Sequence, residues 1–407
     1  MSKVFVFSLA LIFSIFFGQA QPVLPGASNL PQYLPLLKGK QVAVFANQTS
    51  TLGQTHLVDT LLRKGINIKV IFGPEHGFRG TADAGEKVGN YVDEKTGIPV
   101  ISLYGSKRRP SPQDLEGVDI VLFDIQDVGV RFYTFISSLE ELMEGVIAAK
   151  KQLLILDRPN PNGHYVDGPV LDPAFKSFVG MQPVPVVYGM TMGEYARMLV
   201  GEKWISASSQ KIYDSLLNKG KNLIKVIACK NYTHQTVYSL PVKPSPNLPT
   251  MSSIYSYPST CFFEGTVLSE GRGTATPFQV FGHPSLSTEL YSFTPKAMPG
   301  ALYPKFADQT CYGWTISGSS DEVKKKIGNK IQLSFLINAY KLFPDKDHFF
   351  ILPKSGEIKD AFFNKLAGNE ELMLQIIAGE SEESIRKSWE PMLGEFKVIR
   401  RKYLLYK

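Results

Sequence analysis

Cysteine is scarce in this sequence of 407 residues, which contains only Cys229, Cys261 and Cys311. Three scattered cysteines without a Cys-x-x-Cys spacing exclude a disulfide-rich scaffold and a cysteine-based metal site. In an oxidising compartment Cys261 and Cys311 could pair, whereas Cys229 lies on an expected buried strand. The composition, with 43% hydrophobic and 20% charged residues, is that of a globular protein large enough for two domains.

The signature motifs of several enzyme classes are also missing. There is no GxxxxGK[ST] loop and no GxGxxG after a strand, because Gly271-Arg272-Gly273 lacks the strand-to-helix context. The absence of GxSxG argues against a serine hydrolase of the usual kind. None of the six histidines has an HExxH spacing, and only His76, beside Glu75, is suggestively placed. We therefore expect no cofactor and no metal.

Positive charge is in modest excess and is spread along the chain, with a formal net charge of +7. Its local clusters are 107–109, 324–326 and 400–402. Each cluster is typical of a solvated surface, so we expect no nucleic-acid partner.

An apolar run lies at the N-terminus. Lys3 precedes the charge-free run Val4–Phe17, and Gly18 and Ala20 are small residues of the kind that a signal peptidase recognises. The run is shorter than the roughly 18–20 residues of a membrane span. We predict a signal peptide over residues 1–20, export to the periplasm or beyond, and no stable membrane insertion after cleavage.

Apolar runs typical of buried strands alternate with helical patterns through the first half of the chain. Strands buried on both sides and separated by helices predict an α/β fold with a parallel sheet. The expected strands are 41–46, 68–72, 99–104, 118–123, 153–156, 184–188 and 223–228, and the expected helices are 55–64, 138–151 and about 191–200.

Polar and ionisable side chains follow four of these strands. Ligands of parallel sheets bind beyond the carboxyl ends of the strands, so we expect these side chains to share one rim. One of these groups, Glu75 and His76, lies together with Arg79 in a glycine-rich turn, where a ligand can approach the backbone closely. The side chains expected at the rim are Asn47, Glu75, His76, Asp124, Asp127, Asp157, Arg158 and Asn160.

The proline-rich stretch 241–249 interrupts the alternation and predicts a boundary between domains over 21–245 and 246–407. Beyond it, Glu264, Glu270 and Arg272 lie in a glycine-rich constellation that is either a second wall of the site or a pair of tight turns. Further helical patterns cover 321–342, 360–366, 369–378 and 381–389, and the tail 396–406 resembles a packing element.

The chemistry favoured by this set is glycoside hydrolysis, which uses one carboxylic acid to protonate the leaving oxygen and a second group to assist water or stabilise positive charge. Arginines could bind an anionic substituent bidentately, asparagines could bind sugar hydroxyls, and aromatic rings could form an apolar floor. The candidates are the carboxylates Glu75, Asp124, Asp127, Glu264 and Glu270, the arginines Arg79, Arg131, Arg158 and Arg272, the asparagines Asn47, Asn160 and Asn247, and the rings of Tyr104, Phe132 and Tyr133.

Several runs resemble the NamZ-type exo-β-N-acetylmuramidases, in order along nearly the whole chain. They are NQTS (47–50), FGPEHGFRG (72–80), DAGE (83–86), SLYG (102–105), DIQDVGVRFYTF (124–135), LDRPNPNG (156–163), YGMTMGEYA (188–196), PSPNLP (244–249), FEGTVLSEGRGT (263–274) and RRKYLLY (400–406). The resemblance implies a Rossmann-like domain, a smaller C-terminal α+β domain, and a site in the cleft between them. It implies release of N-acetylmuramic acid from the non-reducing end of peptidoglycan fragments, in cell-wall turnover and recycling. It places the proposed catalytic glutamate on Glu75, and Val267 departs from a common asparagine.

We therefore hypothesise that Glu75 is the general acid and that Asp127, Asp124 or Glu264 is its partner. An arginine would hold the lactyl carboxylate of muramic acid. The alternatives are a non-catalytic periplasmic protein that binds muropeptides or sugars, and a metal-assisted amidase or esterase built on His76.

Overall fold

The computed structural model describes residues 21–80 and 89–407. The expected signal peptide and the DAGE run, with Asp83 and Glu86, lie outside these residues. Across the described ranges, no helix has both the length and the apolar character that crossing a membrane requires.

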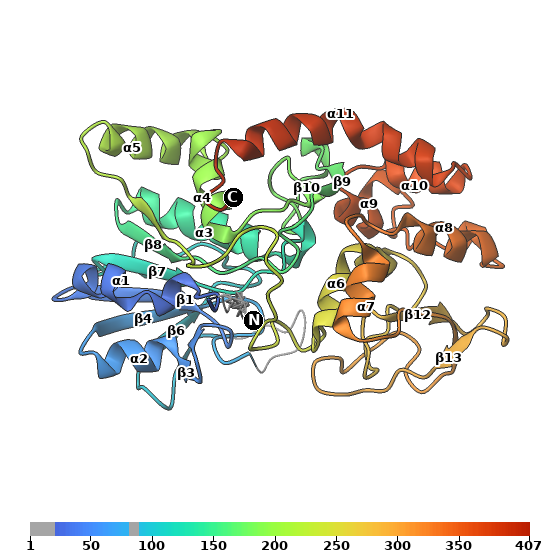
Figure 1. Cartoon of the computed structure of the whole chain (residues 1–407), viewed down its shortest axis with the longest axis horizontal. Coiled ribbons are helices and arrows are strands. Elements are labelled where there is room, and N and C mark those ends of the chain that lie inside the picture. Colours follow the sequence, from blue (N-terminus) through green and yellow to red (C-terminus); the bar gives the residue numbers. More distant parts are fainter. Residues whose placement is uncertain (1–20, 81–88) are drawn as a thin grey trace, which may run out of the picture.

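A seven-stranded sheet forms the centre of the N-terminal half (Figure 1). Its strands are β1 (Gln41–Ala46), β4 (Asn67–Gly73), β5 (Tyr91–Val92), β6 (Pro99–Ser102), β7 (Ile120–Asp124), β8 (Gln152–Leu156) and β11 (Ile224–Ile227). They lie in the order β11-β8-β7-β1-β4-β6-β5, and all neighbours are parallel except β5 and β6. The six parallel strands run outward from β1 in both directions, as in Rossmann folds. This confirms the predicted α/β class.

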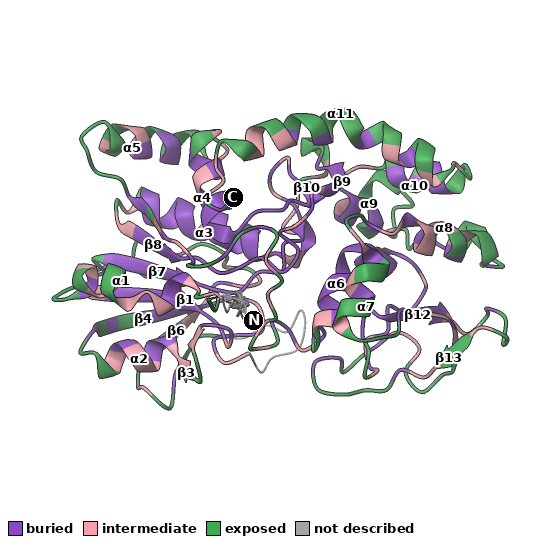
Figure 2. Cartoon of the chain, in the orientation of Figure 1, coloured by how far each residue is buried: buried purple, intermediate pink, exposed green. Residues whose placement is uncertain are grey.

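Both faces of the sheet are covered, because alternate residues of a strand point to opposite sides. In β1, Val42 and Val44 pack into one core, and Ala43 and Phe45 pack into the other. Figure 2 shows most of the sheet buried and the outer surface of the helices exposed. One face carries α1 (Leu30–Leu37) and α2 (Leu57–Arg63), and the other carries α3 (Phe135–Ala148), α4 (Met192–Gly201) and α5 (Ala207–Leu217).

The strand expected over 184–188 is present as β10 (Pro185–Val187), but it does not join the parallel sheet. It pairs antiparallel with β9 (Asp167–Val170) in a separate two-stranded sheet. Pro185 has no N–H to donate, which disfavours a central position in a sheet. The remaining short pair is β2 (Thr51–Leu52) with β3 (Thr55–His56).

The C-terminal half is a smaller α+β unit with its own aromatic-rich core. Its antiparallel sheet has the order β12-β14-β13. The helical pattern over 321–342 forms two helices, because Gly328 caps the first with φ of +65°. The elements are α6 (Met251–Thr260), β12 (Val280–His283), β13 (Tyr291–Phe293), β14 (Cys311–Thr315), α7 (Ser320–Ile327), α8 (Leu333–Leu342), α9 (Phe362–Ala367), α10 (Glu371–Ile377) and α11 (Glu382–Arg401). Cys229, Cys261 and Cys311 are buried and unpaired.

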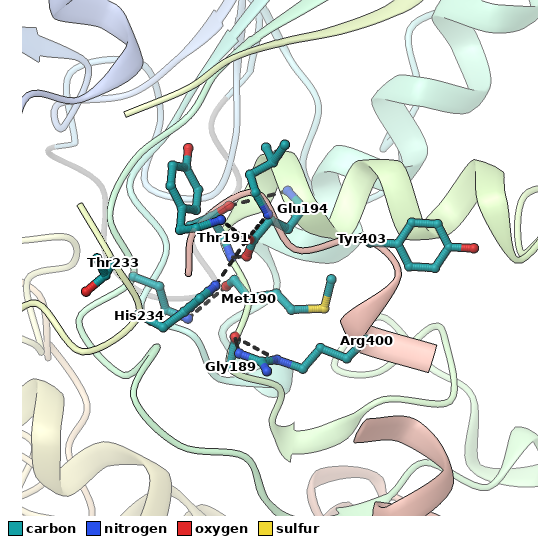
Figure 3. A network of polar contacts seen from close by, with 12 residues as sticks. Gly189, Met190, Thr191, Glu194, Thr233, His234, Arg400 and Tyr403 are labelled. Atoms are coloured by element: carbon teal, nitrogen blue, oxygen red, sulfur yellow. Dashed lines mark hydrogen bonds and ion pairs between the residues drawn. The ribbon is translucent and has the colours of Figure 1, made fainter. Parts of the chain in front are cut away.

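The last helix, α11, returns the chain to the N-terminal half, where the C-terminus lies beside α4 (Figure 1). Arg400 near its end donates from Nε to the carbonyl oxygen of Gly189 at 2.9 Å. The buried carboxylate of Glu194 accepts the N–H of Leu405 at 2.7 Å and lies 3.0 Å from Nε2 of His234 (Figure 3). The RRKYLLY run therefore fastens the end of the chain to the Rossmann-like half.

Candidate active site

A cavity of about 780 Å³ lies between the carboxyl edge of the large sheet and the C-terminal half. Its size is within the range of sites that hold small ligands. The N-terminal half supplies the turn after β4, the loop after β6 and the start of α3, and the C-terminal half supplies the short helix Cys261–Gly265 and the loop 300–304. The lining residues are Glu75, His76, Tyr104, Arg108, Phe132, Tyr133, Thr134, Phe135, Phe178, Val179, Ser245, Asn247, Leu248, Tyr257, Glu264, Arg272, Phe278, Gly300, Ala301, Leu302, Tyr303, Pro304 and Phe362.

Glu75 follows the end of β4 and is held by a residue that follows the neighbouring strand β6. The hydroxyl of Tyr104 donates a hydrogen bond to Oε1 of Glu75 at 2.9 Å. Burial, together with the charge of Glu75, raises the pKa of Tyr104 well above its usual range. The phenol therefore stays protonated and acts as a fixed donor to the carboxyl group.

The backbone of the cavity wall is unusual at three non-glycine positions. His76, Thr134 and Phe278 have φ of 67°, 61° and 62°, in the left-handed region. Side chains other than glycine rarely adopt this conformation, and such residues cluster where function constrains the backbone. At His76 the conformation belongs to the PEHG turn that positions Glu75.

Glu264 is the carboxylate that the C-terminal half contributes to the cavity. Its Oε1 lies 2.6 Å from Nη2 of Arg272, whose Nε lies 3.3 Å from Oε1 of Glu270. The guanidinium also lies over the ring of Phe278, 5.1 Å from the centroid. Lys305 completes the network from the other side, with Nζ 3.1 Å from Oε2 of Glu270. Arg272 is thus shared between a carboxylate in the cavity and one buried behind it.

The structure brings part of the predicted site together and places the rest elsewhere. The predicted residues that line the cavity are Glu75, His76, Tyr104, Phe132, Tyr133, Asn247, Glu264 and Arg272. The predicted residues that do not line it are Asn47, Arg79, Asp124, Asp127, Arg131, Arg158, Asn160 and Glu270.

The ends of β1 and β7 form the point where the strand order reverses, and polar side chains fill the space there. Nε of Arg158 lies 2.5 Å from Oδ1 of Asp124, and Nη2 donates to Oδ2 at 2.9 Å. Oδ1 of Asn47 accepts from the backbone and hydroxyl of Thr49 at 2.9 and 2.6 Å. Asp124 and Arg158 therefore pair with each other, and Asn47 pairs with Thr49. The single shared rim expected from the sequence is therefore divided, with the cavity displaced toward β4 and β6.

Asp127 and Asn160 are also committed to buried hydrogen bonds. Asp127 accepts from the hydroxyl of Tyr188 and from the N–H of Gly129. Burial nevertheless raises the pKa of Asp127 to about 6. Asn160 donates from Nδ2 to the carbonyl of Met190 at 2.8 Å. Both side chains stabilise loops in the interior.

Two of the predicted arginines have structural partners outside the cavity. Arg79 pairs with Asp93, with Nη2 2.9 Å from Oδ2. Arg131 is fully buried, which lowers its pKa to about 9. Its guanidinium joins the two halves by donating to four backbone carbonyls, those of Pro169, Val184, Leu366 and Ala367.

The cavity also contains residues to which the sequence gave another role or none. Tyr104 was expected only as an apolar surface, and Arg108 was expected on a solvated basic cluster. Tyr303 and Leu302 are exposed at the cavity. The sequence feature that could have indicated a polar role for Tyr104 is its position just after the end of strand β6. Within residues 21–80 and 89–407, no three His, Cys, Asp or Glu side chains cluster as they would to hold a metal ion.

Comparisons with known proteins cover both halves of the chain. Residues 42–252 match the family model described as exo-beta-N-acetylmuramidase NamZ, N-terminal, and residues 255–406 match the corresponding C-terminal model. The peptidoglycan beta-N-acetylmuramidase NamZ of Bacillus subtilis (strain 168) is 37% identical over 395 residues, which cover 93% of this chain and 89% of that protein.

Two solved structures from Bacteroides fragilis NCTC 9343, both titled DUF1343 family proteins, have a similar fold. BF0379 is 44% identical with a TM-score of 0.82, and BF0371 is 26% identical with a TM-score of 0.73. Each comparison covers 95% of this chain and 99% of the other.

Proposed function

Because the chain belongs to the exo-β-N-acetylmuramidase NamZ family, we propose that it releases N-acetylmuramic acid from the non-reducing end of peptidoglycan fragments. The family assignment confirms the resemblance seen in the sequence motifs. The observation that carries the proposal is the position of Glu75, which is fixed by Tyr104 in a cavity that contains a second carboxylate, Glu264, from the other half of the chain.

We assign Glu75 as the general acid that protonates the glycosidic oxygen. A general acid must be held within hydrogen-bonding distance of the atom that it protonates. The bond from Tyr104 limits rotation of the Glu75 carboxyl group, and the left-handed turn at His76 fixes the backbone beside it. Glu75 is thereby positioned before the substrate binds.

Glu264 is the second group of the proposed mechanism. Of the three partners expected from the sequence, Asp124 is paired with Arg158 and Asp127 is buried, whereas Glu264 lines the cavity. Its ion pair with Arg272 orients a negative carboxylate, which suits it to assist water or to stabilise the oxocarbenium-like transition state.

Aromatic side chains give the cavity an apolar surface for the sugar ring. Phe132, Tyr133, Tyr257 and Phe278 all line it. The first three pack edge to face, with Phe132 and Tyr133 at 5.3 and 5.9 Å from the ring centroid of Tyr257. Such contacts are rigid, so a sugar would bind without reordering the wall.

The proposed function includes export of the protein. Peptidoglycan lies outside the cytoplasmic membrane, and Met1–Ala20 has the features of a signal peptide. N-terminal sequencing of the mature protein after expression in a bacterial host tests this. A mature chain that begins near Gln21 is expected, and an intact N-terminus on cytoplasmic protein would contradict export.

The activity is tested by incubating the protein with 4-nitrophenyl β-N-acetylmuramide and identifying the released sugar by mass spectrometry. On the disaccharide in which N-acetylmuramic acid is β-linked to N-acetylglucosamine, whose sugar hydroxyl must be protonated to leave, Glu75→Gln should lower kcat by at least about 100-fold, because it removes the proton donor. The exposed Glu116→Gln is the matched control. Saturable binding of the glycoside by the unmodified protein without any cleavage would indicate a binding protein. Loss of turnover with chelators would indicate the metal-assisted alternative.

A further inference from the structure

The basic run Lys107-Arg108-Arg109 contains two residues with carboxylate partners and one without. Nζ of Lys107 lies 2.6 Å from Oδ2 of Asp114, and Nε of Arg109 lies 2.9 Å from Oε2 of Glu141. Arg108 has no carboxylate partner in the described part of the chain, and it lines the cavity. The run is largely solvent-exposed, as expected, but its three residues differ in their partners.

Arg108 is held against the ring of Phe178, with Cζ 4.1 Å from the ring centroid. An arginine stacked on an aromatic face keeps its N–H donors in the plane of the guanidinium, where they can meet a carboxylate bidentately. Its charge also acts on Tyr104, where it opposes the larger upward effects of burial and of Glu75 on the pKa. Arg108 thus lines the same cavity as Tyr104 and Glu75.

The other arginine of the cavity is already neutralised. Arg272 lies within ion-pairing distance of both Glu264 and Glu270. Arg79, Arg131 and Arg158, the remaining candidates for binding an anion, have their partners outside the cavity. Among the described lining residues, Arg108 is consequently the guanidinium that an incoming anion can pair with.

We infer that Arg108 binds the lactyl carboxylate of muramic acid and is the residue by which the cavity prefers muramic acid to sugars without that group. This inference rests on the proposed function. N-acetylmuramic acid differs from N-acetylglucosamine by one lactyl ether, which carries one carboxylate. A guanidinium fork matches that carboxylate in shape and charge. Phe178 presents the fork in a fixed orientation, so little side-chain freedom is lost on binding.

The test compares two substrates that differ only in this charge, 4-nitrophenyl β-N-acetylmuramide and the methyl ester of its lactyl group. The unmodified protein should hydrolyse the acid with a kcat/KM roughly 10- to 100-fold above that of the ester, as a charge-assisted hydrogen bond implies. Arg108→Met should remove most of this ratio by lowering kcat/KM for the acid alone. Arg108→Lys should retain part of it, since the charge remains and the fork is lost.

Arg109→Met is the matched control, because it removes a neighbouring arginine that is paired with Glu141. It should keep the acid-to-ester ratio of the unmodified protein. An Arg108→Met variant that loses activity equally on acid and ester, or that keeps the ratio, overturns the inference. If the unmodified protein cleaves neither substrate, the proposed function fails instead. Calorimetric binding of free N-acetylmuramic acid and its methyl ester to the same variants then decides the role of Arg108.

Discussion

The hydroxyl of Tyr104 lies 2.9 Å from Oε1 of Glu75 and joins the ends of two adjacent strands, β6 and β4. The two residues are brought together by the parallel pairing of Ile71 with Val100, Phe72 with Ile101 and Gly73 with Ser102. The register of the sheet therefore determines the position of the proposed acid. A shift of this pairing by one residue would separate the two side chains.

Tyr104→Phe should lower kcat by roughly 10- to 100-fold with a smaller change in KM, because a hydrogen bond to an ionisable group is lost while the ring remains. Steady-state kinetics on the muramic acid glycoside measures both constants. The melting temperature serves as the control. An unchanged kcat in a stable variant would show that the bond does not position Glu75 for reaction.

Glu264→Gln should lower kcat by about 100-fold or more, as expected for the loss of an acid–base or charge-stabilising group. Glutamine keeps the shape of the side chain, so the melting temperature should change little. Asp127→Asn is the informative comparison because Asp127 was an equal candidate in the sequence. If Asp127→Asn abolishes turnover and Glu264→Gln does not, Asp127 is the second group.

Arg131→Met should destabilise the protein by at least about 3 kcal/mol, because buried carbonyls of Pro169, Val184, Leu366 and Ala367 lose their donor. Chemical denaturation measures the change. The surface substitution Arg109→Met should cost no more than about 1 kcal/mol. Equal effects of the two substitutions would contradict the role of Arg131 in joining the two halves.

The contributions of Asp127 and Asp157 to the stability of the protein should fall as the pH rises through about 6. Burial raises the pKa of both Asp127 and Asp157 to about 6, above the ordinary value of 3.8. The folded state therefore binds protons that the unfolded state has already released, and this stabilisation is lost as the pH rises through the folded pKa. Each group contributes up to about 3 kcal/mol on this basis.

Asp127→Asn should remove the contribution of Asp127 to that pH dependence. At pH 7.5 the variant should gain in melting temperature relative to the unmodified protein, and this gain should be larger than at pH 5. An amide can still accept from Tyr188 and Gly129 without carrying a buried charge. Thermal unfolding at several pH values measures the effect. A variant whose melting temperature has the same pH dependence as that of the unmodified protein would contradict the raised pKa of Asp127.

The sequence predicted the sheet well because its strands are short apolar runs whose burial does not depend on distant partners. It also singled out Glu75 and Glu264, which both line the cavity and lie next to or near glycines in the sequence. It did not predict which polar side chains would pair with one another. Asp124 and Arg158 meet only because β7 and β8 are adjacent, and that pairing depends on tertiary structure. For the same reason the sequence could not show that Arg108 lines the cavity while Lys107 and Arg109 pair with carboxylates.

The C-terminal segment docks where the first residues of the described chain also lie. Leu24 forms an isolated bridge with Lys230, and Val23 packs with Tyr232 and Tyr406. Tyr406 follows α11, so this contact can form only after the C-terminal half has been synthesised. The half of the protein that is synthesised first therefore reaches its final packing only after α11 and the residues that follow it have been made.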